Sequence, residues 1–251
     1  MRRCQIKTQY FLILCREKTM KYLIQHTNEI EEFLIIEKLK EQHLDYEVVD
    51  KPAYIEDYIP VGTIEFVQEC TGKTIKPIEI PYFLQSPYIL RRDYKVVDYN
   101  NLPTTGEYFI KDVSKIKEFA NIINFSNTSK DELDIDKSHL FSVSEIFDIK
   151  AEYRVNVIHN KIDSITNYAG NVTIFPDIST INTIKNLIFL NMPLLNSYTM
   201  DLMVGPKGTA LIEIHNFVAV GLYSTLNGNL PLAYREGISF LKNDSNSWKL
   251  F

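Results

Sequence analysis

The chain has 251 residues, of which 45% are hydrophobic and 24% are charged, which is ordinary for a globular protein. This length allows a substantial core, in one large domain or two smaller ones. The net charge of -5 supplies no basic field, so a nucleic-acid partner is disfavoured.

Targeting and redox signals are sparse. Cys4, Cys15 and Cys70 are odd in number and lack metal-ligand spacing, so neither a disulfide framework nor a zinc site is expected, and a reducing, cytoplasmic compartment fits best. No apolar run reaches the roughly 18 residues of a membrane-spanning helix, and no membrane partner is expected. We interpret residues 1–19 as a dispensable extension before a domain that begins at Met20.

The amino-terminal part predicts a small α/β unit. Residues 21–25 read as a strand, and 29–43 have the apolar spacing of an amphipathic helix. Asn28, with Glu31 three residues later, predicts a capping box at the start of that helix. Residues 46–49 then read as a second strand, which completes a strand–helix–strand order.

A loop-rich region follows from residue 51 to residue 103. Its prolines disfavour long helices, and they stand at positions 52, 60, 77, 81 and 87. The turn-like run 103–106 is the expected boundary between a domain over 20–103 and another over 104–251.

The first half of the second predicted domain alternates between strands and polar connections. Residues 107–111 read as a strand that ends in a lysine, and 115–123 read as a helix. The polar stretch 124–137 predicts a loop or flap, and 139–146 predicts a further strand.

The second half of this domain is dominated by predicted hairpins. Residues 152–158 and 161–168 are expected to pair, with Arg154 projecting from one face. Residues 177–190 predict a helix. After a second hairpin, residues 231–251 read as a helix with a polar tail.

The second hairpin lies within residues 197–223, and its turn is the Gly-Pro-Lys-Gly run at 205–208. Apolar residues alternate on both arms, at 200, 202 and 204 and at 210, 212 and 214. If both sets face one core, Leu202 lies opposite Ile212, and Asp201 lies opposite Glu213 on the other face. A symmetric four-residue loop would break this arrangement, so we expect a five-residue connection or a β-bulge.

The two opposed acids are the first candidates for chemistry. Mg²⁺ takes oxygen ligands, and Asp201 and Glu213 with Asn216 close behind would supply them. The alternative is a solvated polar face of a half-buried sheet. His215 could be a ligand or a general base, although a single histidine is more often structural.

Cationic side chains supply the second group of candidates. Lys111 ends an apolar strand and Lys117 follows it, so either could neutralise a phosphate, although a surface position is the alternative for each. Arg154 could clamp an anion or form an ion pair with Glu152 or another neighbour. The phosphate-binding, dinucleotide-binding, serine-hydrolase and zinc-protease motifs are absent from the sequence.

Four segments in order carry a resemblance to a known family. They are VGTIEFV at 61–67, YFIKDVSKIKEFANII at 108–123, FSVSEIFDIKAEYRVNVIHNKI at 141–162, and the hairpin within 197–223. From about Met20 to Leu241 the chain resembles the ATP-grasp fold, and in particular the phage- and virus-associated R2K clade. The resemblance implies an α+β fold in which two α+β subdomains grip a nucleotide, preceded by a small α/β pre-ATP-grasp domain. For a viral protein it would imply the host cytoplasm.

The resemblance also implies roles for individual residues. Lys111 and Lys117 would contact the phosphates of ATP, and Arg91 or Arg92 would match a further cationic position. Ser144, Glu145 and Ile146 would line the adenine pocket, and Arg154 would face the transferred phosphate or the acyl group. Asp201 and Glu213 would hold magnesium, with either Asn216 or His215 as the further ligand. Asp112 departs from the family pattern, which has a proline after this lysine.

The implied reaction is carboxylate activation with ATP and Mg²⁺ as cofactors. ATP would phosphorylate a carboxylate to an acyl phosphate, and an amine would displace the phosphate. The two substrates could be small molecules, peptides or protein termini. Three alternatives stay open: an inactive nucleotide-binding protein, a metal-dependent nuclease that uses Asp201 and Glu213, and a plain interaction module.

Overall fold

The structure is a computed structural model, and it describes residues 20–76, 80–115, 118–223 and 229–243. The contacts divide the chain into two compact units, Met1–Lys73 and Thr74–Phe251. This division lies earlier than the expected boundary at 103/104, because the strand over Tyr94–Asp98 pairs with Leu140–Ser144 of the second unit. The expected extension over residues 1–19 lies outside the described residues.

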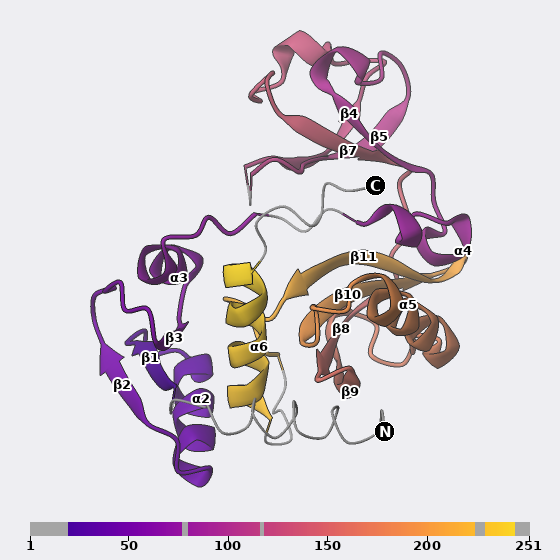
Figure 1. Cartoon of the computed structure of the whole chain (residues 1–251). Coiled ribbons are helices and arrows are strands. Elements are labelled where there is room, and N and C mark those ends of the chain that lie inside the picture. Colours follow the sequence, from indigo (N-terminus) through magenta and orange to yellow (C-terminus); the bar gives the residue numbers. More distant parts are fainter. Residues whose placement is uncertain (1–19, 77–79, 116–117, 224–228, 244–251) are drawn as a thin grey trace, which may run out of the picture. The chain divides into compact units, whose positions relative to one another are not determined.

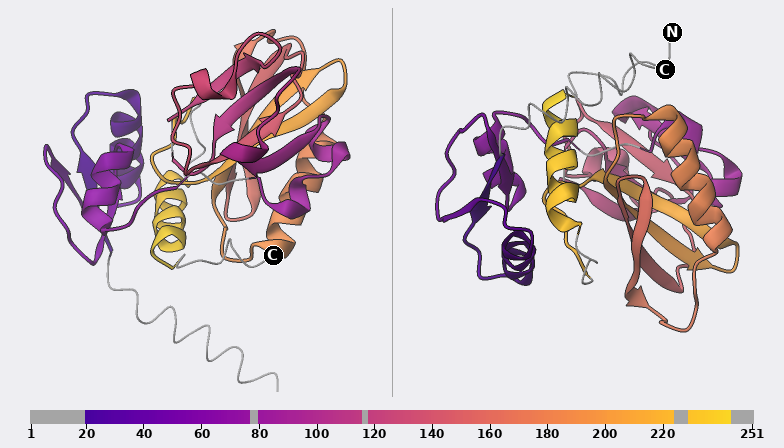
Figure 2. Two further views of the ribbon diagram at one scale, coloured as in Figure 1. Left: turned by 90° about the horizontal axis from the view of Figure 1, so that it is seen from above. Right: turned by 60° about the horizontal axis from the view of Figure 1, so that its bottom comes forward.

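The first unit contains a parallel sheet of three strands in the order β2–β1–β3. The strands are β1 (Lys21–Gln25), β2 (Tyr46–Val49) and β3 (Tyr58–Val61), and the helices are α2 (Ile30–Glu41) and α3 (Ile64–Thr71). Figure 2 shows this group in indigo and purple. The predicted strand–helix–strand order is confirmed. β3 and α3 occupy part of the region that was expected to be loop-rich.

The start of α2 differs from the predicted capping box. Its N-cap is Glu29, which makes no capping side-chain hydrogen bond. Asn28 has a φ of 60°, a left-handed conformation that does not suit an N-cap. In place of Glu31, the buried Glu32 accepts hydrogen bonds from the backbone N–H groups of Thr27 and Asn28, each at 2.8 Å. The capping-box prediction is therefore wrong in both of its residues.

The second unit contains a smaller antiparallel sheet in the order β4–β7–β5–β6. The strands are β4 (Tyr94–Asp98), β7 (Leu140–Ser144), β5 (Glu107–Asp112) and β6 (Ala120–Asn124). The predicted helix over 115–123 is wrong, because β6 forms a ladder with β5 in which Tyr108 lies opposite Ile123. Burial of Ile123 against this sheet outweighs the local helical pattern.

Short helices occupy several of the connections. They are η1 (Tyr82–Leu84), α4 (Pro87–Leu90), η2 (Tyr99–Asn101) and η3 (Lys130–Glu132). The brevity of α4 and η1 agrees with the proline-rich sequence around them. Among the described residues, no helix combines the length and the apolar character that crossing a membrane requires.

The larger sheet of the second unit is also antiparallel, in the order β11–β10–β8–β9 (Figure 1). Its strands are β8 (Ala151–Ile158), β9 (Lys161–Gly170), β10 (Tyr198–Gly205) and β11 (Gly208–Asn216). Both predicted hairpins are confirmed. His159 and Asn160 connect β8 to β9 with positive φ angles of 48° and 61°, as a type I′ turn requires.

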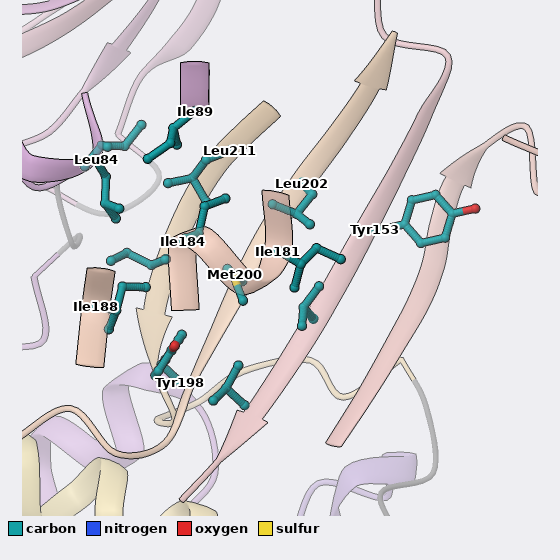
Figure 3. Packing of buried hydrophobic residues seen from close by; sticks show 14 of the residues in the cluster. Leu84, Ile89, Tyr153, Ile181, Ile184, Ile188, Tyr198, Met200, Leu202 and Leu211 are labelled. Carbon is teal, nitrogen blue, oxygen red and sulfur yellow. The ribbon is translucent and has the colours of Figure 1, made fainter. Parts of the chain in front are cut away.

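One face of this sheet packs against α5 (Ile178–Asn191), which confirms the predicted helix. Ile181, Ile184 and Ile188 of α5 face Met200 and Leu202 of β10 (Figure 3). All five side chains are fully buried. With this face committed to the core, strand alternation directs Asp201 and Arg154 to the opposite face. α6 (Leu230–Asn243) contacts β8 and β11.

Candidate active site

The β10–β11 hairpin contains the expected bulge. Asp201 lies opposite Glu213, as predicted, and the register shifts between Asp201 and Leu202. Leu202 is opposite Leu211, so the predicted pairing of Leu202 with Ile212 is wrong. Ile212 is the extra residue, and Leu211 joins the core in its place. The bulge therefore brings the two acids onto one face, as the predicted arrangement required.

Asp201 is held by Arg154 from the neighbouring strand β8. Arg154 Nε donates to Asp201 Oδ1 at 2.8 Å, and Nη2 donates to Oδ2 at 2.7 Å. Both residues are buried, with 4% of Asp201 and 8% of Arg154 exposed. Burial opposes the charge of Arg154, but Asp201 outweighs it and raises the pKa of the guanidinium. The sequence allowed Arg154 to form an ion pair with Glu152 or with another neighbour, and the partner in the structure is Asp201.

The rest of the Arg154 guanidinium is enclosed by backbone and aromatic rings. Nη1 donates to the carbonyl oxygen of Gly221 at 2.8 Å. The ring of Tyr223 lies 4.8 Å from the guanidinium carbon and stacks on Tyr168 with a centroid separation of 5.2 Å. Nothing in the sequence singled out these two tyrosines, because they lie far apart in the chain and meet only through the fold.

Glu213 is the second anionic centre and has two basic neighbours. The Lys111 ammonium donates to Glu213 Oε2, and His215 Nε2 lies 2.8 Å from Oε1. Burial alone would raise the pKa of Glu213, but the hydrogen bond and charge of His215, together with Lys111, hold it well below its usual range. Lys111 belongs to β5 and Glu213 to β11, so this contact connects the two sheets of the second unit.

The two candidates for the further metal ligand lie on opposite faces of β11. His215 follows Glu213 at the strand period of two and contacts it directly. Asn216 is paired with Tyr198, whose side chain belongs to the core on the α5 side. Strand alternation therefore places His215, and not Asn216, on the face of the two acids.

The donor chemistry fits magnesium only in part. Mg²⁺ is commonly bound by one or two carboxylates together with substrate phosphates, which Asp201 and Glu213 can satisfy. Imidazole is a poor ligand for this hard cation. In the described part of the chain, no group of three or more histidine, cysteine or acidic side chains is arranged to hold a metal. The two carboxylates therefore suit a metal ion whose other ligands include phosphate oxygens.

The expected adenine residues lie at the end of β7 and just beyond it. Phe109 is opposite Ser144 and Lys111 is opposite Ser142, so both serines share the face of Lys111. Glu145 pairs through its side chain with Lys207 in the hairpin turn at 2.6 Å, and the pKa of its carboxyl is lowered mainly by that hydrogen bond. Ile146 follows and is half-buried.

Arg91 and Arg92 have different surroundings. Arg91 ends α4 with a φ of 53° and lies over the ring of Tyr88, 4.6 Å from its centroid. Arg92 Nη1 donates to the carbonyl oxygens of Leu90 and Leu211 at 3.0 and 2.9 Å. Within the described ranges neither arginine forms an ion pair with a carboxylate. Burial lowers the pKa of Arg92 to about 10.

The residue after Lys111 has a structural role of its own. Asp112 Oδ1 accepts the N–H groups of Ser114 and Lys115 at 2.7 and 3.1 Å, and Oδ2 lies 2.6 Å from His139 Nδ1. Asp112 therefore anchors the chain that leaves β5, at the position where the family has a proline. Lys117, expected to contact phosphates, lies outside the described residues.

Comparisons with known proteins identify similar families and folds. The family model for the ATP-grasp domain of R2K clade family 2 matches residues 89–230. No curated protein matches the chain by sequence. Three solved structures are similar in fold, although all are at most 13% identical to this chain.

The first is a RimK domain ATP-grasp protein from Sphaerobacter thermophilus, with 11% identity and a TM-score of 0.55 over 88% of this chain and 98% of the other. The second is the ATP-grasp ligase PsnB with a minimal precursor, Mg and ADP, at 10% identity and a TM-score of 0.52 over 89% and 98%. The third is the macrocyclase MdnC from Microcystis aeruginosa with its precursor peptide, at 13% identity and a TM-score of 0.50 over 88% and 99%.

Proposed function

Because the chain belongs to the R2K clade of ATP-grasp domains, family 2, we propose that it is an ATP-dependent ligase that joins a carboxylate to an amine. The observation that carries the proposal is the cluster of alternating charges on one face of the larger sheet. Arg154 and Asp201 form one pair, and Glu213 is in contact with both His215 and Lys111, which reaches it from the smaller sheet. Such a set suits a reaction in which negative charge moves between phosphate and carboxylate.

In this proposal the nucleotide lies along the face of the smaller sheet that carries Lys111. The adenine contacts the end of β7 around Ser144, Glu145 and Ile146. The phosphates extend towards Lys111, with Lys117 as a further contact. The nucleotide contact proposed for Arg92 uses its Nε and Nη2 groups, because Nη1 already binds two carbonyl oxygens.

We propose that Asp201 and Glu213 hold Mg²⁺ together with the phosphates, where the ion neutralises charge on the transferred group. Phosphate groups can take Lys111 as their partner, which releases Glu213. His215 keeps a hydrogen bond to Glu213 and orients that carboxylate. No covalent nucleophile of the protein is required.

The proposed reaction has two steps. A substrate carboxylate oxygen attacks the γ-phosphorus of ATP, the bond to the bridging oxygen breaks, and ADP leaves. The amine nitrogen then attacks the acyl carbon, phosphate departs, and the nitrogen loses a proton to give the amide. Arg154 stabilises the anionic oxygens by its charge and fixed geometry. Because PsnB and MdnC were solved with precursor peptides, a peptide carboxylate is our preferred substrate class.

Calorimetry with Mg-ATP is the first test. Binding should weaken by about tenfold or more in Lys111→Met and Glu213→Gln, since each removes a charged contact worth roughly 1.5–3 kcal/mol. Lys185→Met on α5 is the control and should bind as the wild type does. An absence of binding heat with the wild-type protein would contradict the proposal at its first step.

ADP release screened against peptides and amino acids, with mass spectrometry of the products, is the second test. A mass equal to the two substrates less one water identifies the amide. Nucleotide binding without ADP release for any substrate would favour the inactive nucleotide-binding protein. DNA nicking that Asp201→Asn abolishes would favour the nuclease.

A further inference from the structure

The bulge in β11 decides which face Glu213 occupies. Between the turn and the bulge, Val204 pairs with Thr209 and Met203 with Ala210. Without an extra residue, that pairing would continue with Met200 opposite Glu213. The carboxylate would then point into the apolar face that packs on α5, where an ion without a partner is strongly disfavoured.

The bulge lies beside a partly buried cation, Arg92. β11 is an edge strand of its sheet, so one side of it has no neighbouring strand. Arg92 Nη1 reaches this edge and donates to Leu211 O at 2.9 Å, directly before the extra residue Ile212. The same nitrogen donates to Leu90 O at 3.0 Å, which ties the guanidinium to the end of α4.

The partial burial of Arg92 requires an explanation, since removing even part of a guanidinium from water has a cost. In the described segments it forms no ion pair with a carboxylate that would offset this cost. Its two carbonyl contacts give it a structural role, because they satisfy the backbone where the bulge interrupts the ladder. We propose that Arg92 is a positioning residue that holds the bulge in β11 and so keeps Glu213 opposite Asp201.

Hydrogen exchange of the nucleotide-free protein tests this directly. In Arg92→Met, the amides of residues 208–216 should exchange about tenfold faster or more, because a charge-assisted contact to the strand is lost. Arg92→Lys, which keeps a donor, should restore part of the protection. Lys137→Met is the control and should leave this peptide unchanged, since Lys137 pairs with Asp131 instead.

Deletion of Ile212 separates positioning from other roles. The shortened strand reaches the Asp201–Glu213 pairing with a regular ladder and has no bulge to hold. Any direct nucleotide contact of Arg92 is lost in both backgrounds, so calorimetry should show that Arg92→Met weakens Mg-ATP binding at least about fivefold more in the full-length chain than in the deletion background. Equal losses in both backgrounds would mean that Arg92 acts on the nucleotide or on general stability, and would overturn the proposal.

The exchange measurement keeps the proposal testable if the deletion variant fails to fold. Faster exchange confined to residues 208–216 supports it, whereas unchanged exchange, or an equal increase throughout the larger sheet, contradicts it. The binding comparison rests on the proposed function, but the exchange experiment contains no nucleotide. A protein that fails to bind Mg-ATP would therefore still report on the role of Arg92.

Discussion

Breaking the buried pair of Arg154 and Asp201 should destabilise the second unit strongly. Asp201 is only 4% exposed in this structure, and Arg154→Met removes the two donors that its carboxylate oxygens now bind. Removing one partner of a buried pair typically costs about 3–5 kcal/mol, because the remaining charge stays buried. We expect a loss of that size in the free energy of unfolding.

The double variant Arg154→Met/Asp201→Leu should recover most of this loss. Replacing a buried ion pair by apolar side chains is often neutral, since the desolvation cost disappears with the attraction. Lys137→Met is the control: Lys137 pairs with Asp131 at 2.9 Å, but the side chains are 54% and 70% exposed, so its loss should cost less than about 1 kcal/mol.

Urea-dependent hydrogen exchange, read on peptides from β8 and β10, measures the stability of the sheet that contains the pair. This choice avoids assuming that the two compact units unfold together. Strict additivity of the two single substitutions would refute the reasoning, because it would show that the charges do not depend on each other. Equal losses in Arg154→Met and Lys137→Met would refute it as well.

Three further predictions concern other parts of the chain. Burial opposes ionisation of Glu32, but the hydrogen bonds from His26 and two backbone N–H groups hold its pKa at about 2, below the usual 4.5. Its stabilising contribution is therefore complete above about pH 4.5 and is lost as the pH falls towards 2, and Glu32→Gln should remove this part of the pH dependence of the thermal midpoint. Ile184→Ala should cost about 2–5 kcal/mol in urea unfolding, because the Ile184 side chain of α5 is fully buried against the larger sheet. Gly237→Ala should lower the thermal midpoint, since the new Cβ would lie 2.1 Å from Phe217 O, and this overlap outweighs the roughly 1 kcal/mol helix preference of alanine.

Several features could be predicted from the sequence because they depend on near neighbours. Alternation of apolar residues predicted both hairpins of the larger sheet, and the spacing over 177–190 predicted α5. The same alternation placed Asp201 opposite Glu213 and required a bulge or a longer turn. These inferences held because core-facing residues in a strand repeat with a period of two whatever the rest of the chain does.

The remaining features depended on tertiary contacts. Residues 120–124 form a strand because β5 offers a partner, not because their own pattern requires one. The bulge lies at Ile212 because Leu211 fills the core in its place, and Arg92 contacts β11 at that point. No local pattern encodes such contacts.

The charge cluster shows the same division. The sequence alone determined that two acids, a lysine and an arginine stand at strand positions where they could meet. Only the tertiary structure decided the partners: Arg154 holds Asp201, and Lys111 crosses from the other sheet to Glu213. The physical reason is that an ion pair depends on distance and burial in space, which residues far apart in the sequence acquire only when the sheets assemble.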